Sequence, residues 1–422
     1  MDVVDMIVEN GGQALDDCYQ CGTCSSVCPW GDFRDFRLRN LIRLAQFGIE
    51  GYEGEDLWSC TTCGMCLDRC PRGVKTIDIV RSIRNIMGEA GTLPPLLQSA
   101  LSGLAGNGNP WAGDPDKRSA WASEVGLRPH TEESEILLYT CCTHAYDPRN
   151  IKAQRTLVRL LEKAGVKWGS LGNEEKCCGD PAHKGGRKDV YETLRDGNTE
   201  QIRAKNPKKI VVTSPHCLEN FKKNYEGLKG VEVIHVAELL RDLIRDGRLK
   251  PEKPVKARVA YHDPCYLGRH NGIYDAPREV LKAIPELELV ELSRHHEDSL
   301  CCGGGGGRMW SDTPVAERFS VQRINDACAQ GAQALATACP YCVLMLTDSL
   351  GTVGKQDVLE VVDLGELLAR SIDMGTLEGS APPFGTPPAT PSPSLRPASP
   401  NPPAMVRGEQ SSPAPHATGG GR

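Results

Sequence analysis

The sequence has no apolar run near the ~20 residues that a helix needs to cross a bilayer, and no excess of positive charge. Its formal net charge is −6 and its mean hydropathy is −0.37. Nucleic-acid binding requires a basic surface, so this charge balance argues against that class of function. Residues 1–5 include two acidic residues and no basic segment, which speaks against a secretory signal. We therefore expect a cytoplasmic protein that reaches the cytoplasmic face of a membrane only through a partner.

The chain of 422 residues contains 19 cysteines, but their arrangement is not that of a disulfide framework. Disulfide scaffolds are typically short, exported chains with an even cysteine count. Here the count is odd, and most of the thiols stand in C-x-x-C and Cys-Cys arrangements. This pattern favours reduced thiols in a reducing compartment, where they serve as metal ligands.

Two cysteine runs near the N-terminus, at 18–29 and 60–71, share the spacing C-x₂-C-x₂-C-x₃-C-P. This is the pattern of two-cluster bacterial ferredoxins, in which the fourth cysteine of each run ligates the other cluster. We predict two cubane [4Fe–4S] clusters with the ligand sets Cys18, Cys21, Cys24 and Cys70, and Cys60, Cys63, Cys66 and Cys28. Structural zinc sites usually use two spaced C-x-x-C pairs. A zinc-bound scaffold without a redox role is therefore the less favoured alternative.

The segments around these runs have helical periodicity. Residues 36–45 place apolar side chains on one face and arginines on the other, and a second helix is expected after Cys70. The apolar positions that define the second helix include Ile77, Val80, Ile83 and Met87. We predict an all-α, ferredoxin-like domain over residues 1–90, whose arginines form a solvated face or a docking surface for a partner.

Residues 91–133 are rich in glycine, proline and asparagine, which predicts a surface connector with one helix. Beyond them strands and helices alternate, which favours an α/β fold with a largely parallel sheet. The strands are expected at 136–139, 209–212, 231–234, 258–261 and 334–337, and helices at 149–164 and 238–244.

The α/β region is a tandem duplication. Cys142 matches Cys265 at an offset of 123, and two later pairs, 178 with 302 and 217 with 342, match at offsets of 124 and 125. Such a small drift is what loop insertions produce between two domain-sized repeats. We place the repeats at 134–250 and 251–374. The proline-rich residues 375–422 cannot bury a core and predict a disordered tail.

Five of the six cysteines in the second repeat stand in three groups, two of which follow predicted strands. Loops at the carboxyl ends of parallel strands meet at one edge of a sheet, so these thiols should converge on a metal cluster. They are Cys265, Cys301, Cys302, Cys339 and Cys342. The glycine run at 303–307 directly follows Cys302, and we expect Gly303 and Gly304 to contact the cofactor with backbone N–H groups. A phosphate-binding loop would need G-x-x-x-x-G-K-[ST], which is absent.

The first repeat has four matching cysteines, because serine stands where the second repeat has Cys339. The four are Cys142, Cys177, Cys178 and Cys217. The serine is Ser214, and Cys141 is an extra thiol beside Cys142. This site could hold an ordinary [4Fe–4S] cube, a modified cluster or none. His216 and His262 lie near ligand positions and could be structural residues or proton donors, whereas Cys328 is expected to be a buried core thiol.

These motifs resemble a known family. The series Cys-x₃₄-Cys-Cys-Gly with Ser-Pro-His-Cys, and Cys-x₃₅-Cys-Cys-Gly with Cys-Pro-Tyr-Cys, are similar to the duplicated cysteine-rich (CCG) domain in the B subunit of heterodisulfide reductase. The segments 18–24 and 58–63 resemble the C subunit of the same enzyme. Their fusion over about residues 15–372 resembles the D subunit of heterodisulfide reductase and the DsrK-type proteins of sulfur metabolism.

The resemblance implies a function. In the family, the five-cysteine CCG motif binds a noncubane [4Fe–4S] cluster at which a disulfide is reduced, and this implies such a cluster and such chemistry at the five cysteines of the second repeat. We expect an iron–sulfur oxidoreductase whose cubane clusters deliver electrons there, to reduce or form a disulfide-type bond of a small molecule or a sulfur-carrier protein. The alternative is an electron relay that links a flavoprotein dehydrogenase or electron-transferring flavoprotein to quinone or a membrane cytochrome b.

Overall fold

The computed structural model describes residues 3–374, so the predicted disordered tail over 375–422 lies outside the described residues. The first part of the chain forms short helices and 3₁₀ turns, with no strand among the described residues up to 89. The elements are α1 (Val3–Glu9), η1 (Gln13–Leu15), α2 (Thr23–Ser26), η2 (Pro29–Asp32), α3 (Leu38–Gln46), α4 (Glu55–Ser59), α5 (Met65–Asp68) and α6 (Thr76–Glu89). The two helices expected from periodicity are α3 and α6, and their apolar faces share one core.

Two four-stranded, wholly parallel sheets follow, and they have the same strand order. The first sheet, ordered β2-β1-β3-β4, consists of β1 (Ile136–Tyr139), β2 (Trp168–Gly169), β3 (Lys209–Val212) and β4 (Glu232–His235). The second, ordered β6-β5-β7-β8, consists of β5 (Ala257–His262), β6 (Leu287–Val290), β7 (Ala334–Thr337) and β8 (Glu360–Asp363). The predicted parallel α/β fold and its duplication are thereby confirmed. The central strands β1 and β7 are buried along their whole length, as apolar strands covered by helices should be.

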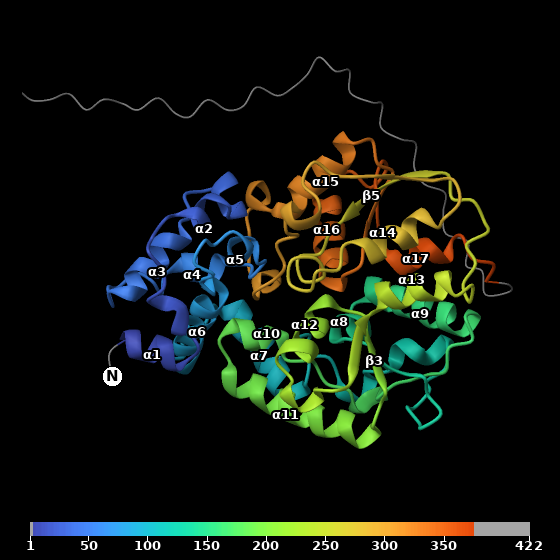
Figure 1. Ribbon diagram of the computed structural model, residues 1–422, viewed down its shortest axis with the longest axis horizontal. Helices are drawn as coiled ribbons and strands as arrows, with labels where there is room; N and C mark the ends of the chain where they lie inside the picture. The colour runs from blue at the N-terminus through green and yellow to red at the C-terminus, as the bar shows by residue number, and fades with distance from the viewer. Residues whose placement is uncertain (1–2, 375–422) are drawn as a thin grey trace, which may run out of the picture. The chain divides into compact units, whose positions relative to one another are not determined.

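Helices cover both sheets and also join the repeats. The first repeat contains α8 (Cys142–Tyr146), α9 (Pro148–Lys163), α10 (Asp180–Gly185), α11 (Lys188–Lys205), α12 (Pro215–Lys223) and α13 (Val236–Arg245). The second contains α14 (Asp275–Lys282), α15 (Phe319–Ala329), α16 (Pro340–Thr352) and α17 (Leu364–Ala369). Helix α13 packs on α14, and α9 packs on α16 and α17, so the two repeats share a helical interface (Figure 1).

Local sequence explains where several of these helices begin. The carboxylate of Asp147 accepts the N–H of Asn150 at 3.2 Å, and Pro148 occupies the first turn of α9. At α13, His235 and Glu238 form a reciprocal capping box. None of the helices between residues 3 and 374 is both long and apolar enough to span a bilayer.

The connector over 91–133 was wrongly expected to lie on the surface. It contains α7 (Pro95–Asn107), whose Leu97, Leu101 and Leu104 are buried in the same core as the first sheet, together with Trp121. These leucines have helical spacing, but the surrounding glycines and prolines dominated the sequence signal. The middle cysteine group of the second repeat has the weakest strand signal before it, and in the structure Cys301 follows a 3₁₀ turn, η7 (His296–Asp298), and a short loop.

Candidate metal centres

Each N-terminal cysteine run has a left-handed backbone conformation at the same two positions. Gln20 and Thr62 have φ of 65° and 53°, and Gly22 and Gly64 have φ of 86° and 84°. Each glycine precedes a one-turn helix, α2 or α5, that carries the third cysteine of its run. Glycine adopts this conformation without steric cost, which explains its place in both motifs.

The fourth cysteine of each run lies beside the other run. Burial, and after it the nearby thiols Cys63, Cys60 and Cys66 of the second run, raise the pKa of the Cys28 thiol. Conversely, the phenol of Tyr19 interacts with both Cys21 and Cys70. This exchange is the placement that the predicted ligand sets require, although ligation itself stays a prediction.

The thiols of these runs are in a setting that suits iron–sulfur clusters. All 19 cysteines lie in the described part of the chain, and none forms a disulfide. The backbone N–H groups of Thr62 and Val74 donate to the sulfur atoms of Cys60 at 3.4 Å and Cys70 at 3.3 Å. N–H donors of this kind help to set the potential of a cluster. The chain therefore offers soft sulfur ligands with supporting donors, which fits the group.

The five predicted cysteines of the second repeat are brought together and are all buried. The sulfur atoms of Cys265 and Cys301 lie 3.9 Å apart, and those of Cys302 and Cys342 lie 3.3 Å apart. Cys339 interacts with Cys342. As expected, the first and last groups leave the carboxyl ends of β5 and β7. The tertiary structure thus gathers a five-thiol site at one edge of the second sheet.

The glycine run does two different things. Gly303, with φ of 90°, donates its N–H to the sulfur of Cys301 at 3.3 Å, and its contact with a cofactor stays a prediction. Gly304 packs closely against Met345, since a Cβ there would lie 2.8 Å from the Cγ atom of that residue, and its contact with a cofactor stays a prediction. Gly305 and Gly306 instead approach the backbone of the second ferredoxin-like run. The run therefore lets a different part of the chain come close to the five-thiol site.

Replacing Gly305 with alanine should disturb this contact. A Cβ there would lie 2.4 Å from the carbonyl oxygen of Thr61, and Gly305 needs no left-handed backbone, so the effect is purely steric. We expect a loss of about 1–3 kcal/mol in unfolding free energy, the usual cost of overpacking, measured by anaerobic urea denaturation. Gly197→Ala in α11, where a Cβ meets no atom within 4 Å, is the matched control and should be neutral or stabilising. Equal stability of the two variants would contradict the steric account.

Two arginines, which the cysteine patterns could not reveal, connect the ferredoxin-like run to the second repeat. The guanidinium of Arg269 donates to the carbonyl of Cys63 at 2.8 Å and also interacts with the thiols of Cys265 and Cys301. Arg84 is fully buried and donates to the carbonyls of Cys60 at 2.8 Å and Gly306 at 2.9 Å. The second cysteine run is therefore held directly against the five-thiol site.

His216 lies between the two repeats. Its Nδ1 atom is 3.0 Å from Asp180, its ring stacks on Tyr266 with 4.0 Å between centroids, and it interacts with Cys339 of the second repeat. Burial alone would lower its pKa, but the Asp180 carboxylate and Cys339 raise it to about 10. The Lys184 ammonium pairs with the same carboxylate. The sequence did not predict that this histidine of the first repeat would reach the second site.

His262 has a different environment. It is fully buried, and within residues 3–374 neither of its ring nitrogens has a hydrogen-bond partner. Its ring lies within 4.8 Å of the thiols of Cys302 and Cys342. Burial lowers the pKa of the imidazole to about 3, so the ring is held neutral. Cys328, expected to be a core thiol, is only half-buried on α15.

The first repeat also gathers its cysteines. The sulfur atoms of Cys142 and Cys177 lie 3.7 Å apart, Cys178 interacts with Cys217, and the amide of Asn220 donates to Cys178 at 3.6 Å. The four predicted thiols are therefore together, and Cys141 is buried beside them.

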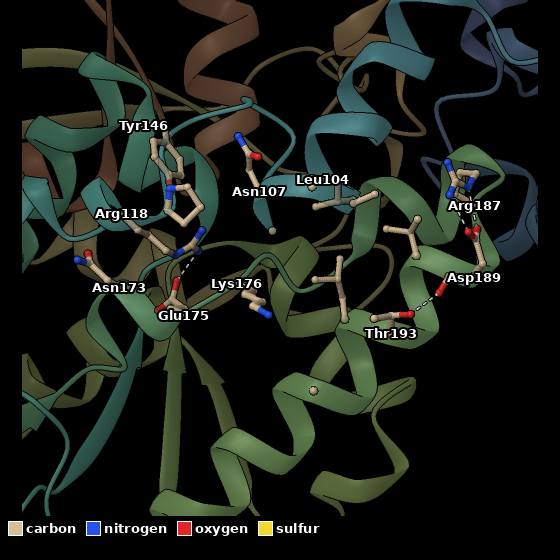
Figure 2. Close-up of a pocket in the computed structure, with 17 residues that line it drawn as sticks. Leu104, Asn107, Arg118, Tyr146, Asn173, Glu175, Lys176, Arg187, Asp189 and Thr193 are labelled. Carbon is tan, nitrogen blue, oxygen red and sulfur yellow. Dashed lines mark hydrogen bonds and ion pairs between the residues drawn. The ribbon is translucent and has the colours of Figure 1, made fainter.

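A pocket of about 390 Å³ lies in the first repeat, between α7, α11 and the loop that contains Glu175 and Lys176 (Figure 2). Arg118 and Glu175 form a buried ion pair in its wall at 2.6 Å, and Glu175 also accepts the N–H of Thr140 at 2.9 Å. Lys176 lines the pocket and is followed in the chain by Cys177. The ion pair thus supports the strand–loop junction that carries the thiols.

Replacing Arg118 with leucine should give a defect that depends on pH. Burial already raises the pKa of Glu175 in spite of the guanidinium. Without that partner the pKa rises further above the unfolded value, so stability is lost as pH rises. We expect a cost of about 3–5 kcal/mol at pH 8 and a smaller one at pH 5, measured by denaturation at both pH values. The double variant Arg118→Leu with Glu175→Leu removes both charges and should flatten the pH dependence; a single-variant defect that is equal at both pH values would contradict the expectation.

Comparisons with known proteins agree with this architecture. A cysteine-rich domain family matches residues 136–222 and 259–347, and a 4Fe-4S dicluster domain family matches residues 14–74. The chain therefore contains a 4Fe-4S dicluster domain followed by two copies of the CCG cysteine-rich domain.

Individual relatives cover most of the chain. The EtfAB:quinone oxidoreductase of Syntrophomonas wolfei is 37% identical over 76% of this chain, and the probable iron-sulfur-binding oxidoreductase FadF of Bacillus subtilis is 35% identical over 75%. The chain spans about half of each, since the matches cover 47% of their lengths. The D subunit of the dihydromethanophenazine:CoB--CoM heterodisulfide reductase of Methanosarcina barkeri is 32% identical over 86% of this chain and 95% of its own length. Because that relative is matched almost from end to end, the chain belongs to the family of the heterodisulfide reductase D subunit.

Proposed function

We propose that this protein transfers electrons from its ferredoxin-like part to the second CCG repeat, where a disulfide-type bond is reduced or formed. In this proposal residues 1–90 are a helical dicluster domain that holds two cubane [4Fe–4S] clusters with the exchanged ligand sets given above. The five thiols of the second repeat hold a noncubane [4Fe–4S] cluster. Bound clusters supply the one-electron steps, and cleavage of a disulfide consumes two electrons and two protons and releases two thiols.

The contact between the second cysteine run and the second repeat carries the proposal. Arg84 donates to the carbonyls of both Cys60 and Gly306, and Arg269, in the loop that follows Cys265, donates to the carbonyl of Cys63 at 2.8 Å. The hydroxyls of Thr62 and Tyr266 are 2.7 Å apart and fix the same junction. An electron donor held against an electron acceptor by buried polar contacts is what fast internal transfer requires.

A pocket beside the second site has room for a small molecule. This pocket of about 260 Å³ is lined by Cys302 itself, by the apolar side chains of Met309, Met345 and Phe319, and by Arg308 and Arg318. Asp312, Glu317 and Asp348 line it as well, and Asp348 pairs with Arg318 at 3.3 Å, so the pocket offers apolar surface without an excess of positive charge. A substrate in this pocket would reach Cys302 beside Trp30 of the ferredoxin-like part, which also lines the pocket.

The first cysteine run is the more exposed of the two. Cys21 is exposed, and Tyr19 beside it keeps 60% of its surface accessible, whereas Cys63 and Cys66 are buried. We propose that a redox partner delivers or receives electrons at this side. We further propose a cytoplasmic protein whose contact with a membrane is made through that partner.

Electron paramagnetic resonance of the anaerobically purified protein tests the proposal. The oxidised protein would be titrated with thiols that differ in charge, such as cysteine, glutathione and 2-mercaptoethanesulfonate. We expect a thiol-dependent paramagnetic signal that disappears in Cys302→Ser and persists in Cys328→Ser. No thiol-dependent signal, with all clusters present, would count against chemistry on a sulfur substrate.

A second candidate function is an electron relay to quinone. It is favoured by the 37% identity to a protein named EtfAB:quinone oxidoreductase. In this case the chain would purify with a flavoprotein or a membrane cytochrome b and would reduce a quinone, not a disulfide. Purification with a sulfur-carrier protein would instead favour disulfide chemistry. Metal analysis separates both from the zinc scaffold, which would contain zinc and lack the brown absorption of iron–sulfur clusters.

A further inference from the structure

The two CCG repeats differ at one position of their last cysteine group. Ser214 and Cys339 both precede a proline at the start of a helix, and both have extended backbones, with φ and ψ of −124° and 131° and of −151° and 124°. The Ser214 side chain is buried, and its hydroxyl has no hydrogen-bond partner among the residues that the structure describes. A polar atom in this state is rare and calls for an explanation. The first site therefore lacks a thiol where its twin has one.

Cys141 has a backbone conformation that a cysteine seldom adopts. Its φ is 70° and its ψ is 142°, a combination found almost only in glycine. The corresponding position of the second repeat is Pro264, which cannot take a positive φ. Strained residues of this kind concentrate at functional sites. The unusual turn occurs in the repeat that has lost a thiol.

The side chain of Cys141 points into the first site. Its thiol is buried and interacts with those of Cys142 and Cys217. In the second repeat, Cys339 has the equivalent relation to Cys342, the counterpart of Cys217. The Cys141 thiol therefore interacts with the last cysteine of the first repeat, Cys217, in the same way as the Cys339 thiol interacts with the last cysteine of the second repeat, Cys342.

We propose that Cys141 replaces the missing thiol, so that the first repeat is a second five-thiolate site for an iron–sulfur cluster. Its ligands are Cys141, Cys142, Cys177, Cys178 and Cys217. Thiolates are much better ligands for such clusters than a serine hydroxyl, which stays beside the site without binding iron. The fifth ligand has moved from the loop after β3 to the loop after β1.

Iron and acid-labile sulfide content of the full-length, anaerobically purified protein tests this assignment. Cys141→Ser should lose about four iron atoms per chain, the content of one [4Fe–4S] cluster, and the associated electron paramagnetic resonance or Mössbauer signal. Ser214→Ala should lose nothing, and Cys328→Ser, a half-buried thiol outside the sites, is the matched control. Loss of iron in Ser214→Ala with full retention in Cys141→Ser would make Ser214 the ligand and overturn the proposal. Retention of all iron in both variants would overturn it as well.

The double variant Cys141→Gly with Ser214→Cys provides an independent test if Cys141→Ser does not fold. Glycine accepts the positive φ at 141, and the new cysteine restores the twin's arrangement. We expect wild-type iron content and the wild-type Mössbauer spectrum, with folding checked by circular dichroism. In the unmodified protein, Cys141 should resist alkylation in mild urea as Cys142 does, while Cys328 is labelled. Labelling of Cys141 together with Cys328 would contradict ligation. These readouts do not depend on activity at the second repeat.

Discussion

Replacing Cys302 with serine is expected to lower disulfide reductase turnover by at least about a hundredfold. Even residues that only support a metal ligand typically change activity by 10–100-fold when they are replaced, and we assign Cys302 as a direct ligand. Its sulfur lies 3.3 Å from that of Cys342, and the residue lines the pocket where a substrate would enter. A serine hydroxyl is a poor substitute for a soft thiolate. The measurement is anaerobic, donor-dependent release of thiol from a disulfide, and Cys301→Ser should behave in the same way.

The ferredoxin-like clusters provide the internal control for that experiment. Their cysteines come from other loops, so their low-temperature spectra should be unchanged in Cys302→Ser. Cys328→Ser, which removes a thiol from α15 outside both sites, should keep full turnover. Unchanged turnover in Cys302→Ser would rule out catalysis at the second repeat and leave the relay function as the better account.

Replacing Arg84 with methionine should destabilise the protein by about 3–5 kcal/mol, the range of the most damaging single substitutions. The guanidinium donates to the carbonyls of Leu57 at 2.7 Å, Cys60 at 2.8 Å, Lys184 at 3.0 Å and Gly306 at 2.9 Å. Methionine fills a similar volume but leaves these buried acceptors without a donor. Since the four carbonyls belong to three different parts of the chain, the variant should also lose iron. Anaerobic urea denaturation and iron analysis measure both effects.

Two further variants make the result specific to this position. Arg84→Lys keeps a positive charge but reaches fewer carbonyls than the planar guanidinium, so its defect should be intermediate. Arg72→Met removes a half-exposed arginine whose ion pair to Asp17 is 3.9 Å long, and should change stability by no more than about 0.5 kcal/mol. If Arg84→Met were as stable as Arg72→Met, the buried arginine would not be what joins the parts.

Much of the fold could be predicted because its signals are local. The strands β1, β3 and β7 coincide with the predicted ranges, since buried parallel strands are continuous apolar runs. The strands β2, β6 and β8 were not predicted, because they lie at the sheet edges and are short or only partly buried. The burial of helix α7 was not predicted, because its core leucines stand in a segment whose glycines and prolines resemble a linker.

The candidate sites show the same division. Spacing alone predicted both ferredoxin-like runs and the five thiols of the second repeat, because a cluster takes its ligands from short loops at fixed intervals. It did not predict that Cys141 belongs with Cys217, because Cys141 lies outside the repeated spacing. The positive φ that turns its thiol into the site is a property of the folded loop.

By itself, then, the sequence determined the cofactor class, the duplication and the family, because all three follow from the types of residue present and from their spacing along the chain. Only the tertiary structure decided that Thr62 meets Tyr266 and that Arg84 meets Gly306, pairs separated by 204 and 222 positions. It also decided that Gly305 and Gly306 pack closely against the backbone of the second cysteine run. Such contacts depend on how whole elements pack, and no local pattern of residues encodes them.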